Sequence, residues 1–133
     1  MLDQGVWLNM IVVLGRVGLA LLFILGGINK LANYGQYLNR IDLAGLPFPD
    51  GLLPLVIFLE IGGGLAVAFG RLFLAPFALA LAAFTLATNI VFHDFWTMSG
   101  DIAELQLSLF FKNVSIAGAL MLLAAITLKD RSR

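Results

Sequence analysis

The sequence predicts an all-α protein, an integral membrane four-helix bundle. Hydrophobic residues make up 61% of the 133 residues and charged residues only 12%, about half the charge content of a typical soluble domain. The apolar residues form four runs, each close to the roughly 20 residues that cross a bilayer as a helix. The expected helices cover about residues 8–31, 52–69, 72–93 and 105–128. We expect residues 1–133 to form a single transmembrane domain.

The first predicted helix begins near Leu8 and is apolar apart from one arginine near its middle. Residues at alternating steps of four and three share a helix face. On the first helix that face carries Arg16, Ala20, Phe23, Gly27 and Lys30, and on the second it carries Leu53, Val56, Glu60, Gly64 and Val67. Residues 62–64 are all glycine, which lets a neighbouring backbone approach closely one turn from the carboxylate.

The longest loop, between the first and second helices, predicts a short interfacial helix. In the stretch that starts at Tyr34, apolar and aromatic residues recur at helical intervals with polar residues between them. The pattern ends at Ala44–Gly45, and Pro47 and Pro49 prevent its continuation. We expect this helix to lie over the outer mouth of the bundle.

Two charged residues lie inside the first two spanning helices, Arg16 in the first and Glu60 in the second. A charge at mid-depth in a bilayer costs at least about 2.5–3.5 kcal/mol, so it needs a partner or a wet cavity. The two helices run in opposite directions, and counting residues puts both charges near mid-membrane. The sequence therefore predicts an Arg16–Glu60 ion pair. Such a pair either serves a functional site or only fixes the register of the helices.

The third and fourth helices add polar side chains toward the outer surface. Thr85, Asn89 and His93 follow one another at steps of four, and Lys112 and Asn113 lie on adjacent sides of the last helix. Aromatic residues occur at the same level, namely Phe92, Phe95, Trp96, Phe110 and Phe111. The sequence predicts an outward-opening polar pocket with aromatic walls, suited to a flat, partly polar ligand. Its expected residues are Arg16, Lys30, Glu60, Asn89, His93, Lys112 and Asn113.

Each of these residues also has a purely structural interpretation. Lys30 and Lys112 can extend toward the lipid headgroups from within a helix. His93 is either a helix-end residue or a proton carrier. The aromatic residues also fit the belts that anchor helices at the two membrane interfaces.

The composition excludes several kinds of chemistry within this chain. It has no cysteine and a single histidine, so a disulfide, a thiolate metal site and bis-histidine haem ligation are not expected. The sequence has no carboxylate cluster for a metal and no triad or nucleotide loop, so a stand-alone enzyme is not expected. The net charge of zero provides no basic surface for nucleic acid. The expected surroundings are the lipid bilayer.

The distribution of basic residues predicts the orientation. With an even number of helices, both termini lie on one side, together with Arg71 and the basic tail after residue 128. That side carries four basic residues, whereas the other side carries Lys30 and Arg40. Because basic residues favour the cytoplasm, the N- and C-termini are predicted to be cytoplasmic.

An ordered set of motifs in this chain resembles the DoxX family of small four-helix integral membrane proteins. The matching pieces are Gly15–Arg16, Phe23–Lys30, Ala44–Pro47, Leu59–Gly63, Phe69–Arg71, Asn89, Phe92–His93 and Phe111–Gly118. They extend over about residues 12–126. The resemblance implies a bacterial-type plasma (inner) membrane and an association with quinol- or quinone-linked oxidoreductase systems.

The resulting hypothesis is an accessory subunit of a membrane oxidoreductase system that binds a quinone or a similar small molecule. Glu60 would relay a proton beside Arg16, redox partner subunits would supply electrons, and Lys112, Asn113 or His93 would hydrogen-bond the ligand. The alternatives are a small-molecule or lipid transport component acting as a homo-oligomer, and a scaffold or assembly subunit without a ligand.

Overall fold

The computed structural model describes residues 3–133, and its regular elements are helical. In chain order they are α1 (Gln4–Ala32), α2 (Tyr34–Leu43), α3 (Pro49–Phe69), α4 (Leu74–Phe92), the 3₁₀ turn η1 (Phe95–Thr97) and α5 (Gly100–Arg131). Helices α1, α3, α4 and α5 are each long and apolar enough to cross a bilayer. The predicted all-α membrane bundle is therefore confirmed, and α2 confirms the short helix predicted in the first loop.

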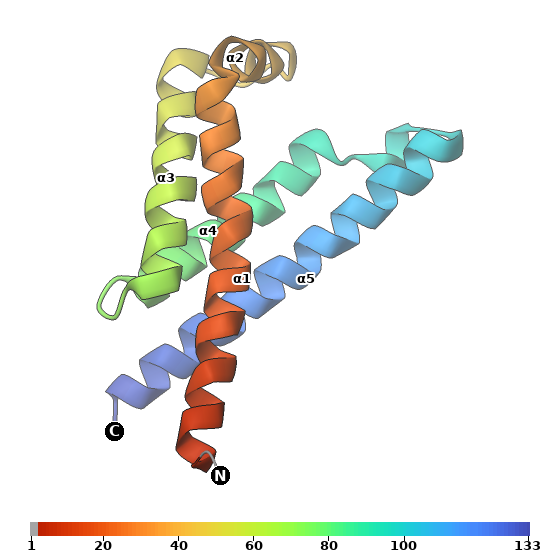
Figure 1. Ribbon diagram of the computed structural model, residues 1–133. Coiled ribbons are helices and arrows are strands. Elements are labelled where there is room, and N and C mark those ends of the chain that lie inside the picture. The colour runs from red at the N-terminus through yellow and green to blue at the C-terminus, as the bar shows by residue number, and fades with distance from the viewer. Residues whose placement is uncertain (1–2) are drawn as a thin grey trace.

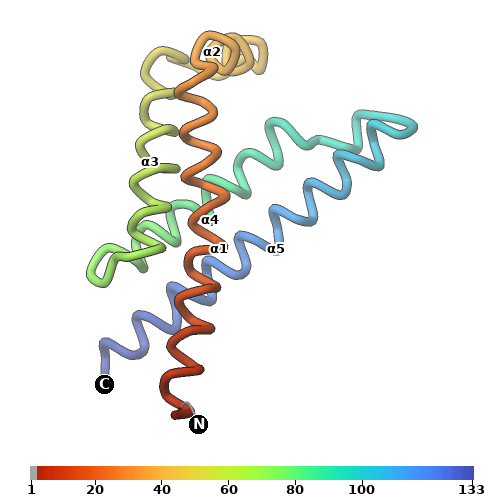
Figure 2. The backbone as a smooth tube through the Cα atoms, in the orientation of Figure 1, coloured from red at the N-terminus to blue at the C-terminus, as the bar shows by residue number. Residues whose placement is uncertain are grey.

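The four long helices form two hairpins. Helix α1 packs on α3, α4 packs on α5, and α3 joins the two hairpins through its contacts with α4. Figure 1 shows that the hairpins cross near the α3–α4 turn and diverge toward their other ends. Both termini lie at one end, and α2 lies at the opposite end of the α1–α3 hairpin. The tube in Figure 2 makes the divergence of α4–α5 from α1 and α2 plain.

The core lies where the hairpins cross, and much of it is alanine. The buried residues of this cluster are Ala20, Phe23, Val67, Leu74, Ala75, Ala78, Leu81, Ala82, Ala117, Leu120 and Ala124. Small side chains let membrane helices approach closely, so that van der Waals contact replaces the hydrophobic effect that is absent between helices in lipid. The small side chains at the crossing point therefore let the two hairpins approach closely.

Glycines set the distance between α1 and α3. A Cβ atom added to Gly64 would lie 2.6 Å from Ile24 Cγ1 and 3.1 Å from the carbonyl oxygen of Ala20, both on α1. A Cβ atom added to Gly27 would lie 2.6 Å from Ile61 Cγ1. The glycine run on α3 was predicted to let a neighbouring backbone approach closely, and at Gly64 the backbone of α1 does so.

The two terminal helices are longer than predicted. Helix α1 begins at Gln4, and α5 ends at Arg131. At the same end of the molecule, α3 already ends at Phe69 and α4 begins at Leu74. Figure 1 shows α1 and α5 continuing past the α3–α4 turn toward the termini. This offset decides which residues of α1 lie beside which residues of α3.

Candidate functional site

The charged site inside the α1–α3 hairpin consists of Lys30 and Glu60. Lys30 Nζ lies 2.9 Å from both carboxylate oxygens and donates a hydrogen bond to Oε1. Oε2 is as close to Nζ and forms the ion pair with it, but no hydrogen bond to this oxygen occurs within the described residues. The Glu60 side chain is 7% exposed and that of Lys30 is 19% exposed. The site is thus a nearly buried ion pair with one unused acceptor.

Helix α2 lies next to this pair, at the end of the α1–α3 hairpin opposite the termini (Figure 1). The ring centroid of Tyr37 is 5.2 Å from Lys30 Nζ and 5.3 Å from Arg40 Cζ. The Tyr37 hydroxyl accepts a hydrogen bond of 2.8 Å from Asn29 Nδ2. Apolar contacts fix α2 on α3, through a cluster built on Ile41, Leu53 and Ile57. The Tyr37 ring is therefore close to two cations, one of which is the lysine of the ion pair.

The predicted ion pair between Arg16 and Glu60 is wrong. Arg16 Nε donates a 2.7 Å hydrogen bond to the carbonyl of Val67, and a terminal nitrogen donates one of 2.6 Å to the carbonyl of Gly70. These carbonyls belong to the C-terminal end of α3, where the last carbonyls of a helix have no intrahelical donor. Arg16 therefore caps α3 and does not form the floor of a pocket.

The offset of the helices explains this correction. Gly26 lies beside the carboxylate, since its Cβ position is 3.1 Å from Glu60 Oε1. Arg16 precedes Gly26 by ten residues, which is about 15 Å along a helix axis. Counting from the middle of each apolar run placed Arg16 and Glu60 at equal depth, but α1 extends well beyond α3. The partner of Glu60 is the lysine near the other end of α1.

A second polar group lies on the α4–α5 hairpin. Asn89 is 1% exposed, and its Nδ2 donates a 2.9 Å hydrogen bond to the carbonyl of Phe110. Its Oδ1 accepts a 2.9 Å hydrogen bond from Asn113 Nδ2. Amide bonds of this kind hold membrane helices together. The two asparagines predicted for the site thus bind each other and join α4 to α5.

His93, which follows the C-terminal end of α4, pairs with a residue of α5. Its Nδ1 lies 2.6 Å from Gln106 Oε1, within hydrogen-bonding distance. Four aromatic rings stack edge to face beside this end of α5, namely Phe95, Trp96, Phe110 and Phe111. Four of the five aromatic residues predicted to line a pocket thus cluster on the α4–α5 hairpin, without Phe92.

The seven predicted site residues therefore do not converge on one pocket. Lys30 and Glu60 form one group, while Asn89, Asn113 and His93 belong to another, on the hairpin that diverges in Figure 1. Lys112 is exposed. The sequence interpretation did not assign Tyr37 or Asn29 to the site. The sequence did contain a signal for them, because both lie close to Lys30 along the chain, at the end of the first helix and in the short helix that follows.

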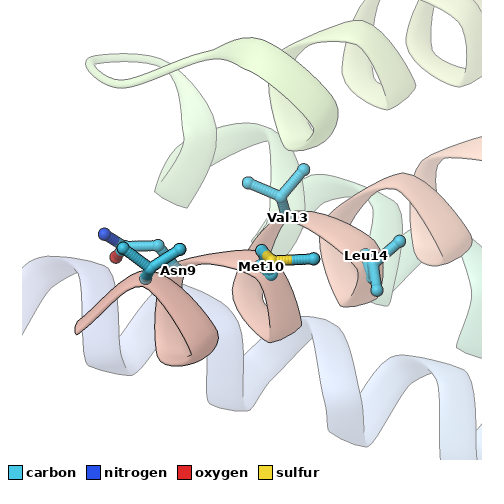
Figure 3. Close-up of a pocket in the computed structure, with 5 residues that line it drawn as sticks. Asn9, Met10, Val13 and Leu14 are labelled. Carbon is cyan, nitrogen blue, oxygen red and sulfur yellow. The ribbon is translucent and has the colours of Figure 1, made fainter. Parts of the chain in front are cut away.

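Two surface hollows are lined by residues other than the charged pair. Figure 3 shows one of about 400 Å³ along the first turns of α1, lined by Val6, Asn9, Met10, Val13 and Leu14. Its lining comes from a single helix, so it is a shallow apolar groove. Another, of about 350 Å³, lies between α2 and the start of α3. Among residues 3–133, no three His, Cys, Asp or Glu side chains are grouped as a metal site would require.

Comparison with known proteins places the chain among membrane proteins. The DoxX family model matches residues 11–94. Inner membrane protein YqjF of Escherichia coli K12 is 40% identical over 114 residues, which cover 85% of this chain and 81% of that protein. Inner membrane protein YphA of the same organism is 30% identical over 122 residues, covering 92% and 86%. No solved structure matches.

Proposed function

This chain belongs to the DoxX family of membrane proteins, and from that premise we propose that it is an accessory subunit of a membrane oxidoreductase system. In this proposal Lys30 and Glu60 bind the headgroup of a quinone or a similar small molecule in the inner membrane. The single observation that carries the proposal is a nearly buried Lys–Glu pair with an unused carboxylate oxygen. Ionisable residues in spanning helices commonly mark ligand or proton pathways.

The unused hydrogen-bonding capacity of the pair fits a quinone. An ammonium group has three protons, and Lys30 donates one of them to Glu60 Oε1. A quinone carbonyl accepts such a proton from the partly exposed ammonium group of Lys30. A quinol hydroxyl donates to Oε2 only after α1 and α3 separate enough to admit it, because that oxygen is buried. In this proposal both oxidation states of the headgroup use the same pair of side chains.

The surroundings of the pair also suit a flat ring at the outer end of the hairpin. Tyr37 presents an aromatic ring 5.2 Å from Lys30 Nζ, and its hydroxyl keeps its own proton for donation while accepting from Asn29. Helix α2 contributes Tyr37 and lies over the end of α1 and α3. Aromatic side chains with a few convergent polar groups are typical of small-molecule sites.

The role of the protein in this proposal is binding and electrostatics. When bound, a quinone supplies the electron chemistry, and a partner subunit exchanges the electrons. Lys30 orients the headgroup and Glu60 holds or releases a proton at Oε2. The chain itself needs no metal or thiol for these tasks.

Extraction in mild detergent followed by quantitative mass spectrometry tests this proposal. The wild-type protein is expected to retain quinone, and Lys30→Met and Glu60→Gln are each expected to retain several-fold less. Lys129→Met is a matched control, because it makes the same chemical change at an exposed position in the last turn of α5. Equal quinone in wild type and both site variants would contradict the proposal.

A second candidate function, assembly with another membrane subunit, is favoured by Lys112. This residue is exposed on a helix that would span the membrane, and no salt bridge or hydrogen bond of its side chain occurs within residues 3–133. A charge in such a position calls for a partner outside the chain, either a lipid headgroup or a residue of another subunit. Lys112→Met is expected to lower the recovery of a co-purified subunit while leaving quinone content unchanged if assembly is the role of this residue.

A further inference from the structure

Phe48 holds a backbone conformation that phenylalanine rarely adopts. Its φ of 52° and ψ of 56° lie in the left-handed region, and it is the one non-glycine residue with positive φ in the described chain. For a bulky L-residue this conformation is unfavourable because Cβ approaches the carbonyl oxygen. Gly45, in the same loop, shows that a glycine is used nearby where positive φ is needed. The geometry of the turn therefore does not explain why position 48 carries a phenylalanine and not a glycine.

The side chain of Phe48 contributes nothing to the core. It is 84% exposed, and Leu43, at the other end of the same loop, is 78% exposed. These two residues flank a short turn, residues 44–47, that joins α2 to α3. An exposed aromatic side chain on a strained backbone is typical of a residue held out for contact with something else.

The position of Phe48 points to the bilayer as its partner. It immediately precedes Pro49, the first residue of a helix long and apolar enough to span a bilayer, and the ends of such a helix are expected at the bilayer boundary. The outward side chains of that helix continue the same apolar surface, with Leu55 and Phe58 each more than half exposed. Helix α2, on the other side of the turn, has apolar residues against α3 and polar residues such as Gln36 and Asn39 exposed. The apolar face of α2 is thus occupied by α3, so contact of this corner with lipid depends on the side chains that leave the turn, Leu43 and Phe48.

We propose that the α2–α3 corner is a membrane anchor, in which Phe48 and Leu43 insert into the lipid interface and hold α2 over the outer end of the α1–α3 hairpin. The partner is the bilayer itself, at the boundary between headgroups and acyl chains. The left-handed backbone of Phe48 directs an apolar side chain into lipid at the point where the chain turns into the spanning helix. This inference does not depend on the ligand of Lys30 and Glu60.

Site-directed spin labelling tests the anchor directly, because the chain has no cysteine. Phe48→Cys carries the nitroxide, and Gln36→Cys on the exposed side of α2 carries the same label as a matched control. Both proteins are reconstituted into vesicles of phosphatidylcholine and phosphatidylglycerol. Collisions with oxygen, which concentrates in lipid, are compared with collisions with a water-soluble nickel chelate. The ratio of oxygen collisions to nickel-chelate collisions is expected to be several-fold higher for the label at position 48 than for the label at position 36.

Two results would overturn the proposal. Preference for the nickel chelate at both positions would place the corner in water. Protection of position 48 from both reagents would mean that protein, such as a second copy, covers it. If Phe48→Cys fails to fold, Leu43→Cys gives the same comparison at the other end of the turn. As an independent measurement, Phe48→Gly relieves the backbone strain, and it is expected to increase amide exchange in α2 in vesicles but not in detergent.

Discussion

At the scale of single residues, Lys30 and Glu60 depend on each other. Either charge alone would be costly in a spanning helix, and the pair removes most of that cost through a 2.9 Å contact. The two residues differ in what they would do without a partner. Lysine can extend its long side chain toward the headgroups, whereas the Glu60 carboxylate is 7% exposed and enclosed by α1 and α3.

This asymmetry gives the first prediction. Lys30→Met leaves an unpaired buried carboxylate and is expected to cost about 3 kcal/mol of unfolding free energy, the lower end of the range for a broken buried pair because Lys30 is partly exposed. Glu60→Met is expected to cost less, since Lys30 then reaches the headgroups. The Lys30→Met/Glu60→Met double variant should recover most of the loss. Unfolding in detergent measures all four proteins, and a double variant as unstable as the sum of the single ones would contradict the pairing.

Arg16 has a different structural role, and this role gives the second prediction. Its two hydrogen bonds to the carbonyls of Val67 and Gly70 each involve a charged donor, and such bonds contribute roughly 1.5–3 kcal/mol. Arg16→Met is therefore expected to destabilise the protein by about 3 kcal/mol. In a double-mutant cycle with Glu60→Gln, the coupling energy is expected to stay below about 0.5 kcal/mol, because the residues share no contact. A large coupling energy would mean that Arg16 and Glu60 interact, as the sequence predicted, and would contradict the arrangement in the structure.

At the scale of helices, the register of the α1–α3 hairpin depends on glycine. Gly64→Ala would place a methyl group 3.1 Å from a backbone oxygen and 2.6 Å from Ile24, so α1 would have to move. We expect a loss of about 1–3 kcal/mol, as for other overpacked contacts. Gly18→Ala is the matched control, since a Cβ atom there has no neighbour within 4 Å and alanine favours the helix by up to about 1 kcal/mol. Thermal unfolding in detergent compares the two, and equal effects would contradict close packing at Gly64.

The helices and the pairing of their polar residues differ in how far the sequence could predict them. The four apolar runs and the amphipathic stretch from Tyr34 to Leu43 determine α1 to α5 locally, so all were found, with ends shifted by a few residues. The pairing of Glu60 depends on the relative shift of α1 and α3. That shift results from the length of α1 beyond Arg16 and from glycine contacts between helices, and neither follows from the periodicity of one segment.

The same reasoning applies to the second hairpin. Asn89, His93 and Asn113 were predicted to lie in the outer half of the bundle and were assigned to one pocket with Glu60. They instead bond within the α4–α5 hairpin. The angle at which the two hairpins cross separates them from Glu60, and this angle depends on the alanine-rich contact of α4 with its neighbours. A sequence pattern gives the face of each helix but not the crossing angle between helices.

At the scale of the whole molecule, the two hairpins expose different chemistry at the ends that diverge. The α1–α3 hairpin carries the ion pair under α2, and the α4–α5 hairpin carries His93 and exposed Lys112. The two hairpins touch mainly through α3 and α4. In a bilayer, the apolar side chains at these diverging ends are expected to contact lipid, because the two hairpins do not bury them against each other.

The orientation of the whole molecule is the last prediction, and the structure strengthens its basis. Both termini lie at the end opposite α2 (Figure 1), with Arg71 and the basic tail on that side. At the other end the basic residues near the helix ends are Lys30 and Arg40. The larger number of basic residues on the side of the termini favours cytoplasmic termini.

Labelling of single cysteines in intact bacterial cells measures this orientation, since the chain has no native cysteine. Asn39→Cys, on the exposed side of α2, is expected to react with a membrane-impermeant maleimide in intact cells. Ser132→Cys, at the C-terminus, is expected to react only after the membrane is permeabilised. Both positions are exposed, so a difference in reactivity reports the side of the membrane and not burial. The reverse pattern would place α2 and the Lys30–Glu60 site toward the cytoplasm, and a ligand would then have to reach the pair from that side.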